Sequence, residues 1–279
     1  MRFTKMHGIG NDYIYINCMS GVDVDPSDLA IRMSPRHLSV GSDGVVLICS
    51  SDSADAKMRI FNADGSEAKM CGNAIRCVGK YLYERDIVKK DILTVDTLSG
   101  IKTLHLNIKD GKVETVSVDM GHAVIKPSDI PVIFGGERMI NEPVEIAGKE
   151  YRMTAVSMGN PHAVIYMDEI ASLRLDEIGP DFENHKIFPD RVNTEFVRVI
   201  ARNELDMRVW ERGSGETFAC GTGACAVATA SVLNGICDAG VPIKIHLLGG
   251  MLTITCTDDL RVTMEGPAEF VYDGEYFLS

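Results

Sequence analysis

The chain has 279 residues, a formal net charge of −12, 45% hydrophobic residues and 24% charged residues. This is the composition of a globular protein long enough for two domains, and its acidic balance argues against nucleic acid or an anionic membrane as a partner. The first twenty residues lack the apolar core of a signal peptide, and the apolar run at residues 224–233 is too short to cross a bilayer. We therefore expect a cytoplasmic protein whose eight cysteines are mostly reduced.

The first half of the chain alternates short strands with two helices. Strands are expected at residues 3–7, 14–17, 45–49, 57–62, 93–97, 101–108 and 113–120. Helices are expected from Pro26 to about Met33, and from just after Cys71 to about Glu84. The turn at residues 7–12 combines two glycines with an Asn-Asp pair, which favours positive φ and a loop shaped for a ligand.

The second half repeats this plan after a weakly patterned stretch at residues 121–131. Strands are expected at residues 154–158, 163–167, 193–201 and 204–210, in later hairpins, and in a tail strand at 269–278. A helix should follow Cys220 and end at Leu233, before Asn234 and Gly235. Because this helix is apolar on every side, we expect it to be buried all round, with strands wrapped about it.

A single offset relates the two halves. Cys220 lies 149 positions after Cys71 (220 − 71 = 149), and residues 58–61 resemble residues 207–210 at the same offset. Gly10-Asn11 likewise falls on Gly159-Asn160 (160 − 11 = 149). We therefore predict an α+β fold of two duplicated, pseudo-symmetric domains, each a rolled β-sheet around a central helix. The predicted domains are residues 1–120 with a returning strand at 267–279, and residues 121–266.

The repeated cysteines indicate acid–base chemistry. A thiol at a helix N-terminus meets unpaired N–H groups and the positive end of the helix dipole, which favour thiolate and predict a lowered pKa. If both helices faced one cleft, their amides would bind a carboxylate with one thiol on each side. The thiolate of Cys71 or Cys220 could then remove an α-proton while the other thiol protonates the opposite face. This inversion requires no cofactor.

Polar residues beside the repeated loops suit an amino-acid substrate. Glu211 could accept hydrogen bonds from an ammonium group, Arg212 could bind a second carboxylate, and His162 could adjust a thiol. Amide donors and acceptors are offered by Asn11, Asn62, Asn160 and Asn193.

The motifs at residues 7–13, 62–67, 71–77, 159–162 and 211–223 resemble those of the diaminopimelate epimerase family, and the likeness covers the whole chain. The resemblance implies a pyridoxal-phosphate-independent enzyme that interconverts LL- and meso-2,6-diaminopimelate in lysine and peptidoglycan precursor synthesis. It also implies a homodimer, with Tyr272 at its interface.

The resemblance assigns roles to individual residues. Cys71 and Cys220 become the two acid–base thiols, usually described as donor and acceptor respectively in the forward direction. His162 and Glu211 would adjust the thiol pKa values. The substrate would contact Asn11, Asn62, Gly72, Asn73, Asn160, Asn193, Glu211, Arg212, Gly221 and Thr222. One departure is Gly44, where some members of the family carry a glutamine that contacts substrate.

Less specific interpretations were weighed against these. The remaining cysteines are expected to be packing residues: Cys18, Cys49, Cys77, Cys225, Cys237 and Cys256. A metal site is disfavoured because the thiols lack the close pairs of zinc sites. Residues 221–226 match the loose glycine fingerprint for dinucleotides, but no acidic residue follows about twenty positions later.

Two other functions stay open at this point. A cofactor-independent racemase or isomerase on the same duplicated fold would differ only in substrate. A thiol–disulfide protein could instead use Cys71 and Cys220 as a redox couple, although it would lack the usual Cys-x-x-Cys motif.

Overall fold

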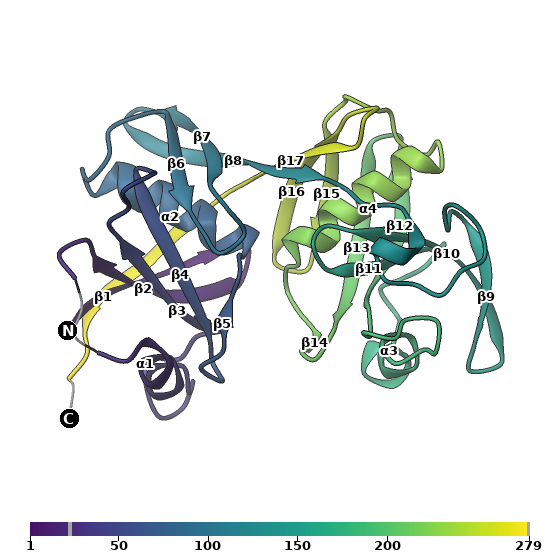
Figure 1. Ribbon diagram of the computed structural model, residues 1–279, viewed down its shortest axis with the longest axis horizontal. Helices are drawn as coiled ribbons and strands as arrows, with labels where there is room; N and C mark the ends of the chain where they lie inside the picture. Colours follow the sequence, from purple (N-terminus) through teal and green to yellow (C-terminus); the bar gives the residue numbers. More distant parts are fainter. Residues whose placement is uncertain (22–23, 278–279) are drawn as a thin grey trace. The chain divides into compact units, whose positions relative to one another are not determined.

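The computed structural model describes residues 1–21 and 24–277, and the chain divides into two compact units. The first unit comprises residues 1–119 together with the described residues from Glu265 onward, and the second comprises Met120–Met264. In each unit, strands surround one 13-residue helix (Figure 1). The predicted α+β class is therefore confirmed.

The elements follow the chain as two similar series. Those of the first unit are β1 (Arg2–Gly8), β2 (Asn11–Cys18), α1 (Pro26–Met33), β3 (Gly44–Cys49), β4 (Ala56–Asn62), β5 (Glu67–Ala68), α2 (Gly72–Glu84), β6 (Ile92–Asp96), β7 (Lys102–Lys109), β8 (Lys112–His122) and β18 (Glu269–Glu275). Those that follow β8 are η1 (Pro127–Asp129), β9 (Glu142–Ile146), β10 (Lys149–Ser157), β11 (Pro161–Tyr166), α3 (Leu175–Glu183), β12 (Asn193–Ala201), β13 (Glu204–Glu211), β14 (Gly215–Glu216), α4 (Gly221–Leu233), β15 (Ile243–Leu247), β16 (Gly250–Cys256) and β17 (Arg261–Gly266).

Strand pairing repeats from one unit to the other. β1 pairs with β2 antiparallel and β2 with β3 parallel, as β10 does with β11 and β11 with β12. Tyr13 lies opposite Gly44, and His162 lies opposite Asn193, so both partners have moved by 149 positions (162 − 13 and 193 − 44). Because backbone pairing as well as sequence keeps this offset, the predicted duplication is confirmed.

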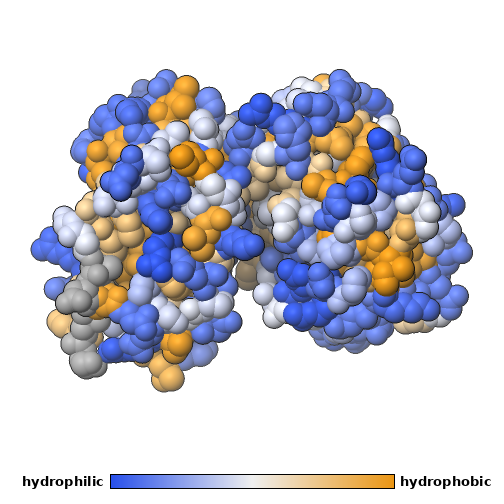
Figure 2. Space-filling view, viewed as in Figure 1, coloured by the Kyte–Doolittle hydropathy of each residue, from blue (hydrophilic) through white to orange (hydrophobic). Residues whose placement is uncertain are grey.

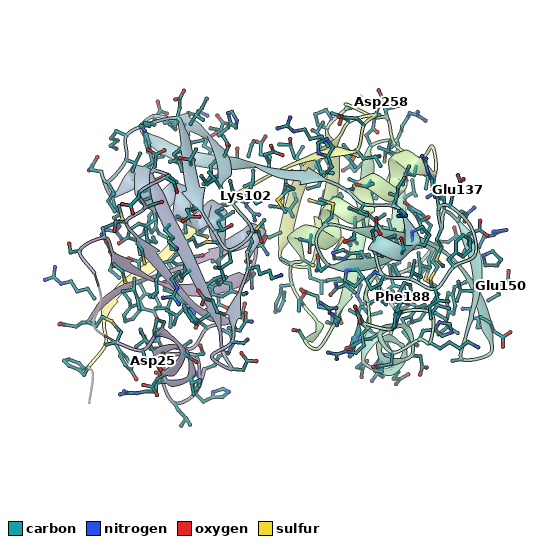
Figure 3. All side chains as sticks on the ribbon, viewed as in Figure 1. Asp25, Lys102, Glu137, Glu150, Phe188 and Asp258 are labelled. Atoms are coloured by element: carbon teal, nitrogen blue, oxygen red, sulfur yellow. The ribbon has the colours of Figure 1, made fainter. Side chains whose placement is uncertain are left out.

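The two faces of the first unit's sheet pack against different helices. Asp25, labelled in Figure 3, caps α1 by accepting a 3.0 Å hydrogen bond from the Ser27 amide. The apolar face of α1 packs in one core cluster with Val45 and Leu47 of β3. Alternation along the strand points Val46 to the other face, which it shares with Tyr15, the residue paired with it on β2. Tyr15 contacts α2 there, so α1 and α2 lie on opposite faces.

Helix α4 is buried on all sides. Of its residues up to Ser231, only Thr222 is partly exposed, and the helix packs against β10, β11, β12, β15 and β16. Its many Ala, Gly and Ser residues have small side chains that let the strands approach closely. The predicted all-round burial of this apolar helix is confirmed.

The residue patterns did not predict helix α3, strand β9, or the short elements β5, β14 and η1. Pro180 lies inside α3 and weakens its helical signal, yet α3 begins 149 positions after α1 (175 − 26 = 149). The repeat could therefore have identified it. Phe182 on α3 packs edge-on against Phe196 of β12, with ring centroids 5.1 Å apart, in a core that includes Phe188, labelled in Figure 3.

The predicted tail strand is shorter than expected, since β18 ends at Glu275. The last two residues of the expected returning strand, 278–279, lie outside the described residues. Figure 2 shows polar residues interspersed with separate apolar patches on the visible face of each unit. None of the helices in the described ranges combines the length and apolar character needed to span a membrane.

Candidate active site

Both predicted catalytic cysteines lie at the start of a helix. Cys71 immediately precedes α2 with extended backbone (φ −139°, ψ 120°), and Cys220 immediately precedes α4 with a similar conformation (φ −117°, ψ 105°). Gly72 and Gly221 are the first residues of the two helices. The first N–H groups of a helix have no partner within the helix, so each thiol lies beside donors suited to an anion. The predicted helix-terminal position of both thiols is confirmed.

In the first unit, Cys71 is partly exposed and contacts Asn11. Its Sγ donates to Asn11 Oδ1 over 3.4 Å, and Asn73 Nδ2 donates to the same oxygen over 3.4 Å. Asn11 begins β2 directly after the two-residue turn that follows β1. The fold thus brings three of the predicted site residues together.

The turn before Asn11 holds two residues at positive φ, Ile9 at 48° and Gly10 at 86°. The predicted positive φ is confirmed at Gly10 but not at Gly8 or at the Asn-Asp pair, and Ile9 takes the other positive value. The two together match the hairpin turn that needs positive φ at both positions. Such a backbone costs a β-branched residue roughly 1–3 kcal/mol, and Ile9 is buried, so packing offsets the strain. The turn fixes where Asn11 meets the thiol.

Asp43, which the sequence analysis did not select, anchors Asn11. Its Oδ2 accepts from Asn11 Nδ2 over 2.8 Å and from the Asp12 amide over 3.0 Å, while Oδ1 accepts from Arg36 over 2.7 Å. Burial, and then the charge of Asp12, raises the pKa of Asp43. The only sequence signal was its position directly before Gly44.

Arg76, also missed, supports Asn73 from within α2. Its side chain is fully buried, and it donates to Asn73 Oδ1 over 3.0 Å and to the Gly72 carbonyl over 3.1 Å. A Cβ on Gly8 would lie 3.0 Å from the Asn73 carbonyl oxygen, so β1 approaches this turn closely because residue 8 is glycine.

The structure gives a reason for glycine at position 44, the departure from the family pattern noted above. A Cβ at this position would lie only 2.0 Å from the carbonyl oxygen of Phe61 on the paired strand β4. No side chain, glutamine included, fits this backbone arrangement. Asn62 lies opposite Gly44 on β4, and its Nδ2 donates a hydrogen bond to Ser66 Oγ over 3.0 Å.

In the second unit, Cys220 is only 5% exposed. Its Sγ accepts from the Gly223 amide over 3.3 Å and lies 3.6 Å from Thr222 Oγ1. Burial, followed by the charges of Glu211 and Glu195, nevertheless raises its pKa well above the usual value. The prediction that the helix N-terminus lowers the thiol pKa is therefore wrong for Cys220, because desolvation outweighs the donors.

Asn160 and His162 are connected to this thiol through Thr222. Asn160 Nδ2 donates to Thr222 Oγ1 over 3.4 Å, and His162 Nε2 lies 3.0 Å from Asn160 Oδ1. On its other side, His162 Nδ1 lies 2.6 Å from Glu195 Oε1. Glu195 was missed, and the repeat could not have revealed it because the equivalent residue is Val46 (195 − 149 = 46).

Asn193 joins two loops at the start of β12. Its Nδ2 donates to the Pro161 carbonyl over 2.8 Å, and its Oδ1 accepts from the Arg212 amide over 2.9 Å. The Arg212 guanidinium donates to the Asp190 carbonyl over 2.9 Å. The neighbouring Glu211 carboxylate accepts from the Thr217 hydroxyl, and burial raises its pKa.

A further missed residue, Glu183 of α3, holds the turn that follows Glu211. Its carboxylate accepts from Trp210 Nε1 over 2.8 Å, from the Gly213 amide over 2.9 Å and from Arg191 over 2.9 Å. The missed helix therefore positions a loop that carries two predicted substrate contacts.

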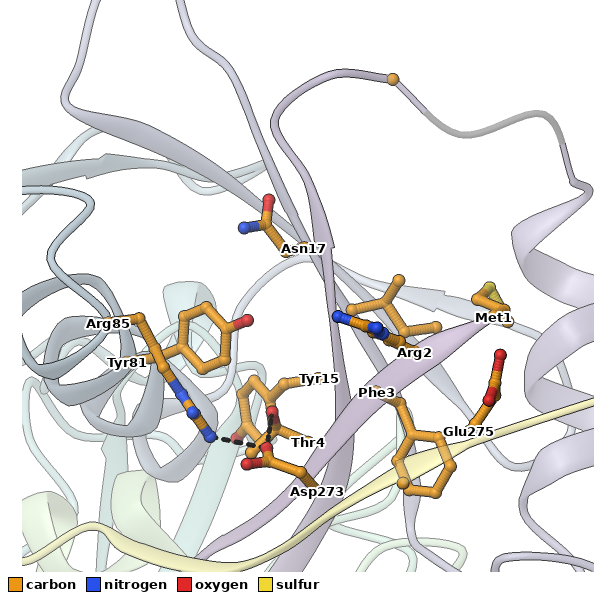
Figure 4. Close-up of a pocket in the computed structure, with 13 residues that line it drawn as sticks. Met1, Arg2, Phe3, Thr4, Tyr15, Asn17, Tyr81, Arg85, Asp273 and Glu275 are labelled. Carbon is orange, nitrogen blue, oxygen red and sulfur yellow. Dashed lines mark hydrogen bonds and ion pairs between the residues drawn. The ribbon is translucent and has the colours of Figure 1, made fainter.

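The first unit also contains a cavity of about 730 Å³. It is bounded by β1, β2, β18 and the end of α2, and Asp273 within it accepts from Arg85 over 2.5 Å and from Thr4 over 2.6 Å (Figure 4). None of the predicted catalytic or substrate-binding residues lines it. Within the described part of the chain, no three His, Cys, Asp or Glu side chains are grouped as metal ligands.

Sequence comparisons give one consistent result. The family model described as diaminopimelate epimerase matches residues 3–126 and 154–271. The diaminopimelate epimerase of Acetivibrio thermocellus is 55% identical over 100% of this chain and 99% of its own length. That of Methanococcus maripaludis strain S2 is 51% identical over 99% of each chain.

Solved structures with low sequence identity share the fold. A probable proline racemase from Agrobacterium radiobacter superposes with a TM-score of 0.72 at 15% identity, covering 100% of this chain and 93% of that one. A PhzF-family phenazine biosynthesis protein from Bacillus anthracis gives 0.71 at 15% identity, covering 100% and 99%. At this identity the similarity concerns the fold alone.

Proposed function

The chain belongs to the diaminopimelate epimerase family, and on this premise we propose that it interconverts LL- and meso-2,6-diaminopimelate with Cys71 and Cys220 as the acid–base pair. The observation that carries the proposal is the repeated arrangement of the thiols. In each unit, one cysteine precedes an equivalent 13-residue helix. The asparagine loop of the same repeat contacts the cysteine itself in the first unit and Thr222, two residues after the cysteine, in the second.

The proposed reaction moves one proton off a carbon and another onto it. The thiolate of one cysteine takes the α-proton, and the C–H electron pair passes into an enolate-like carbanion. The second cysteine then gives its proton to the opposite face, which leaves one thiol and one thiolate as before. N–H groups at the starts of α2 and α4 would stabilise the charge that develops on the carboxylate.

The raised pKa of Cys220 sets a condition on this cycle. Burial, followed by the charges of Glu211 and Glu195, raises this pKa and favours the protonated thiol. To act as the base, Cys220 has to lose that proton. We propose that the substrate ammonium binds near Glu211 and offsets its charge, so that substrate binding itself lowers the thiol pKa.

The remaining assignments complete the proposed site. Asn73 and Thr222, with Gly72 and Gly221, would bind the reacting carboxylate through the helix starts. Arg212 would bind the distal carboxylate, since a guanidinium pairs with a carboxylate through two hydrogen bonds. The other proposed contacts are Asn11, Asn62, Asn160 and Asn193. His162 and Glu211 would adjust the thiols.

Assembly as a homodimer through Tyr272 is part of the proposal. Tyr272 is 45% exposed on β18, although its ring packs edge-on against Phe3 with centroids 5.9 Å apart. A large aromatic side chain presented at the surface is a common interface anchor. Sedimentation of Tyr272→Ala, expected to shift toward monomer, tests this. Cytoplasmic localisation stays a prediction, which cell fractionation can check.

Solvent exchange tests the function. In heavy water with LL-diaminopimelate, the protein should form meso product carrying deuterium at the α-carbon. Cys71→Ser and Cys220→Ser should each lower turnover at least about 100-fold, the scale of a lost acid–base group, while the substrate still binds. Cys237→Ser, a buried cysteine outside the site, is the control and should retain turnover. Turnover that survives either catalytic substitution would exclude the two-thiol mechanism.

A further inference from the structure

Glu195 is a fully buried carboxylate with one hydrogen-bonded partner. Its side chain and that of His162 both have 0% exposure, and Oε1 lies 2.6 Å from His162 Nδ1. The second carboxylate oxygen, Oε2, is buried and has no hydrogen-bond partner among the described residues. A buried carboxylate costs free energy unless it is paired, so this arrangement requires a reason beyond packing.

The carboxylate lies against the first turn of α4. A Cβ on Gly223 would be 2.7 Å from Glu195 Oε1 and 3.2 Å from the Cys220 sulfur. The absence of a side chain at residue 223 therefore admits both groups to the same turn. Val46, the equivalent residue in the first unit, carries no charge.

Four hydrogen bonds connect Glu195 to the sulfur of Cys220. After the 2.6 Å contact to His162, they join His162 Nε2 to Asn160 Oδ1 at 3.0 Å and Asn160 Nδ2 to Thr222 Oγ1 at 3.4 Å. The last joins Thr222 Oγ1 to Cys220 Sγ at 3.6 Å.

Donor and acceptor roles follow in order along this chain. Because Asn160 directs its NH₂ group to Thr222, its carbonyl oxygen faces His162, and Nε2 must carry a hydrogen. Thr222 accepts from Asn160 and can direct its own hydrogen to the sulfur. If Nε2 lacked its hydrogen, the Asn160 amide would turn over and the threonine hydroxyl would be drawn away from the sulfur.

We propose that Glu195 is a positioning residue for Cys220: it holds the His162 ring at Nδ1, keeps Nε2 directed to Asn160, and so keeps the Asn160 NH₂ group and the Thr222 hydroxyl aligned toward the sulfur. In this arrangement one hydrogen lies between Glu195 Oε1 and Nδ1, and another lies on Nε2. A hydroxyl that donates to sulfur stabilises the thiolate, which Cys220 must become to act as a base. The inference rests on the proposed function for its catalytic consequence.

The first test needs neither substrate nor a variant. ¹⁵N spectra of protein labelled at histidine should show His162 with hydrogen on Nε2 and a shared proton at Nδ1. Assignment uses the loss of these signals in His162→Gln. Finding Nε2 without hydrogen in the wild-type protein would overturn the proposal. Because this readout is independent of turnover, it remains decisive even if the protein does not act on diaminopimelate.

The second test measures coupling along the chain. Glu195→Leu, which removes the hydrogen-bonding partner of Nδ1, should lower kcat about tenfold and change KM by less than about threefold, a small part of the usual acid–base contribution. In a Thr222→Val background, where the hydroxyl is already absent, the same substitution should lower kcat by less than about twofold. An equal loss in both backgrounds, or no loss in either, would overturn the proposal.

The chain offers a matched control. Glu204 and His246 form another Glu–His pair in the same unit, with Oε1 and Nε2 2.8 Å apart, but both are partly exposed and belong to no path to a thiol. Glu204→Leu should leave kcat within about twofold of the wild type. Thermal unfolding of each variant verifies folding, and if Glu195→Leu fails to fold, the histidine spectra of the wild-type protein decide the question.

Discussion

The two candidate catalytic thiols occupy the same position in a repeat but have different surroundings. Cys71 is partly exposed, and its partner Asn11 is anchored by Asp43. Cys220 is buried, and it is connected through a histidine to the buried carboxylate of Glu195. The duplication kept the helix start and the asparagine in both copies, so it kept the position of the sulfur.

Three exchanged side chains account for much of this difference. At equivalent positions, Tyr13 in the first unit corresponds to His162, Val46 to Glu195, and Asn62 to Glu211 (each 149 apart). The second unit therefore carries a histidine and two glutamates where the first unit carries a tyrosine, a valine and an asparagine. A duplicated backbone can therefore hold two thiols in matching positions while neighbouring residues give them separate acid–base behaviour.

The largest expected effect concerns Gly44. The first unit has glycine at this position of the repeat, whereas the second unit has Asn193. Gly44→Ala should destabilise the protein by roughly 4 kcal/mol or more, because the new Cβ would lie 2.0 Å from a backbone oxygen. Gly100→Ala is the control: it has positive φ but nothing within 4 Å, and should cost about 1 kcal/mol. Urea unfolding measures both. Equal costs would show that β3 can move away from β4.

An ion pair conserved in the repeat gives a smaller contrast. Arg59 pairs with Glu67, and Arg208 with Glu216, each through a 2.8 Å contact from Nε. Arg208 is less exposed and also donates to three backbone carbonyls, the shortest contact being 2.7 Å. Arg208→Met should cost about 2 kcal/mol and Arg59→Met about 0.5 kcal/mol in unfolding free energy. A larger cost for Arg59→Met than for Arg208→Met would contradict the prediction that Arg208 contributes more to stability.

The smallest expected effect tests why the two thiols, Cys71 and Cys220, should differ in reactivity. Burial is the main cause of the raised pKa of Cys220 and the negative charge of Glu211 is the next, so Glu211→Gln should lower that pKa and speed alkylation of Cys220 about tenfold at pH 8. In the wild type, partly exposed Cys71 should react ahead of Cys220. Iodoacetamide labelling followed by peptide mass analysis gives both rates.

Cys49 supplies an internal control for that labelling. A hydrogen bond from Cys18, and then the nearby charges of Arg59 and Lys57, lowers the pKa of Cys49 to about 7. Its alkylation rate should be the same with and without the Glu211 substitution. If the Cys220 rate does not rise relative to Cys49, the carboxylate does not control the buried thiol.

The fold could be predicted largely because the repeat and the local patterns agreed. Helices α1, α2 and α4 begin or end where capping residues, glycine and proline placed them. Helix α3 was not predicted because Pro180 lowers its helix propensity, although the repeat places a helix start at Leu175. Consistent local signals are readable from the chain, whereas an element stabilised by Phe182 in a shared core depends on tertiary packing.

The sequence by itself determined the duplication, the two thiols at helix starts and the asparagine loops, because each depends on residues close together along the chain. The tertiary structure alone decided which side chains surround each thiol: Asp43 and Arg76 in one unit, Glu195 in the other. It also reversed the expected pKa of Cys220: the local pattern predicted a buried helix α4, but only the tertiary structure showed that the thiol before it is itself buried, with Glu211 and Glu195 near it. Desolvation there outweighs the helix N-terminus that the sequence made visible.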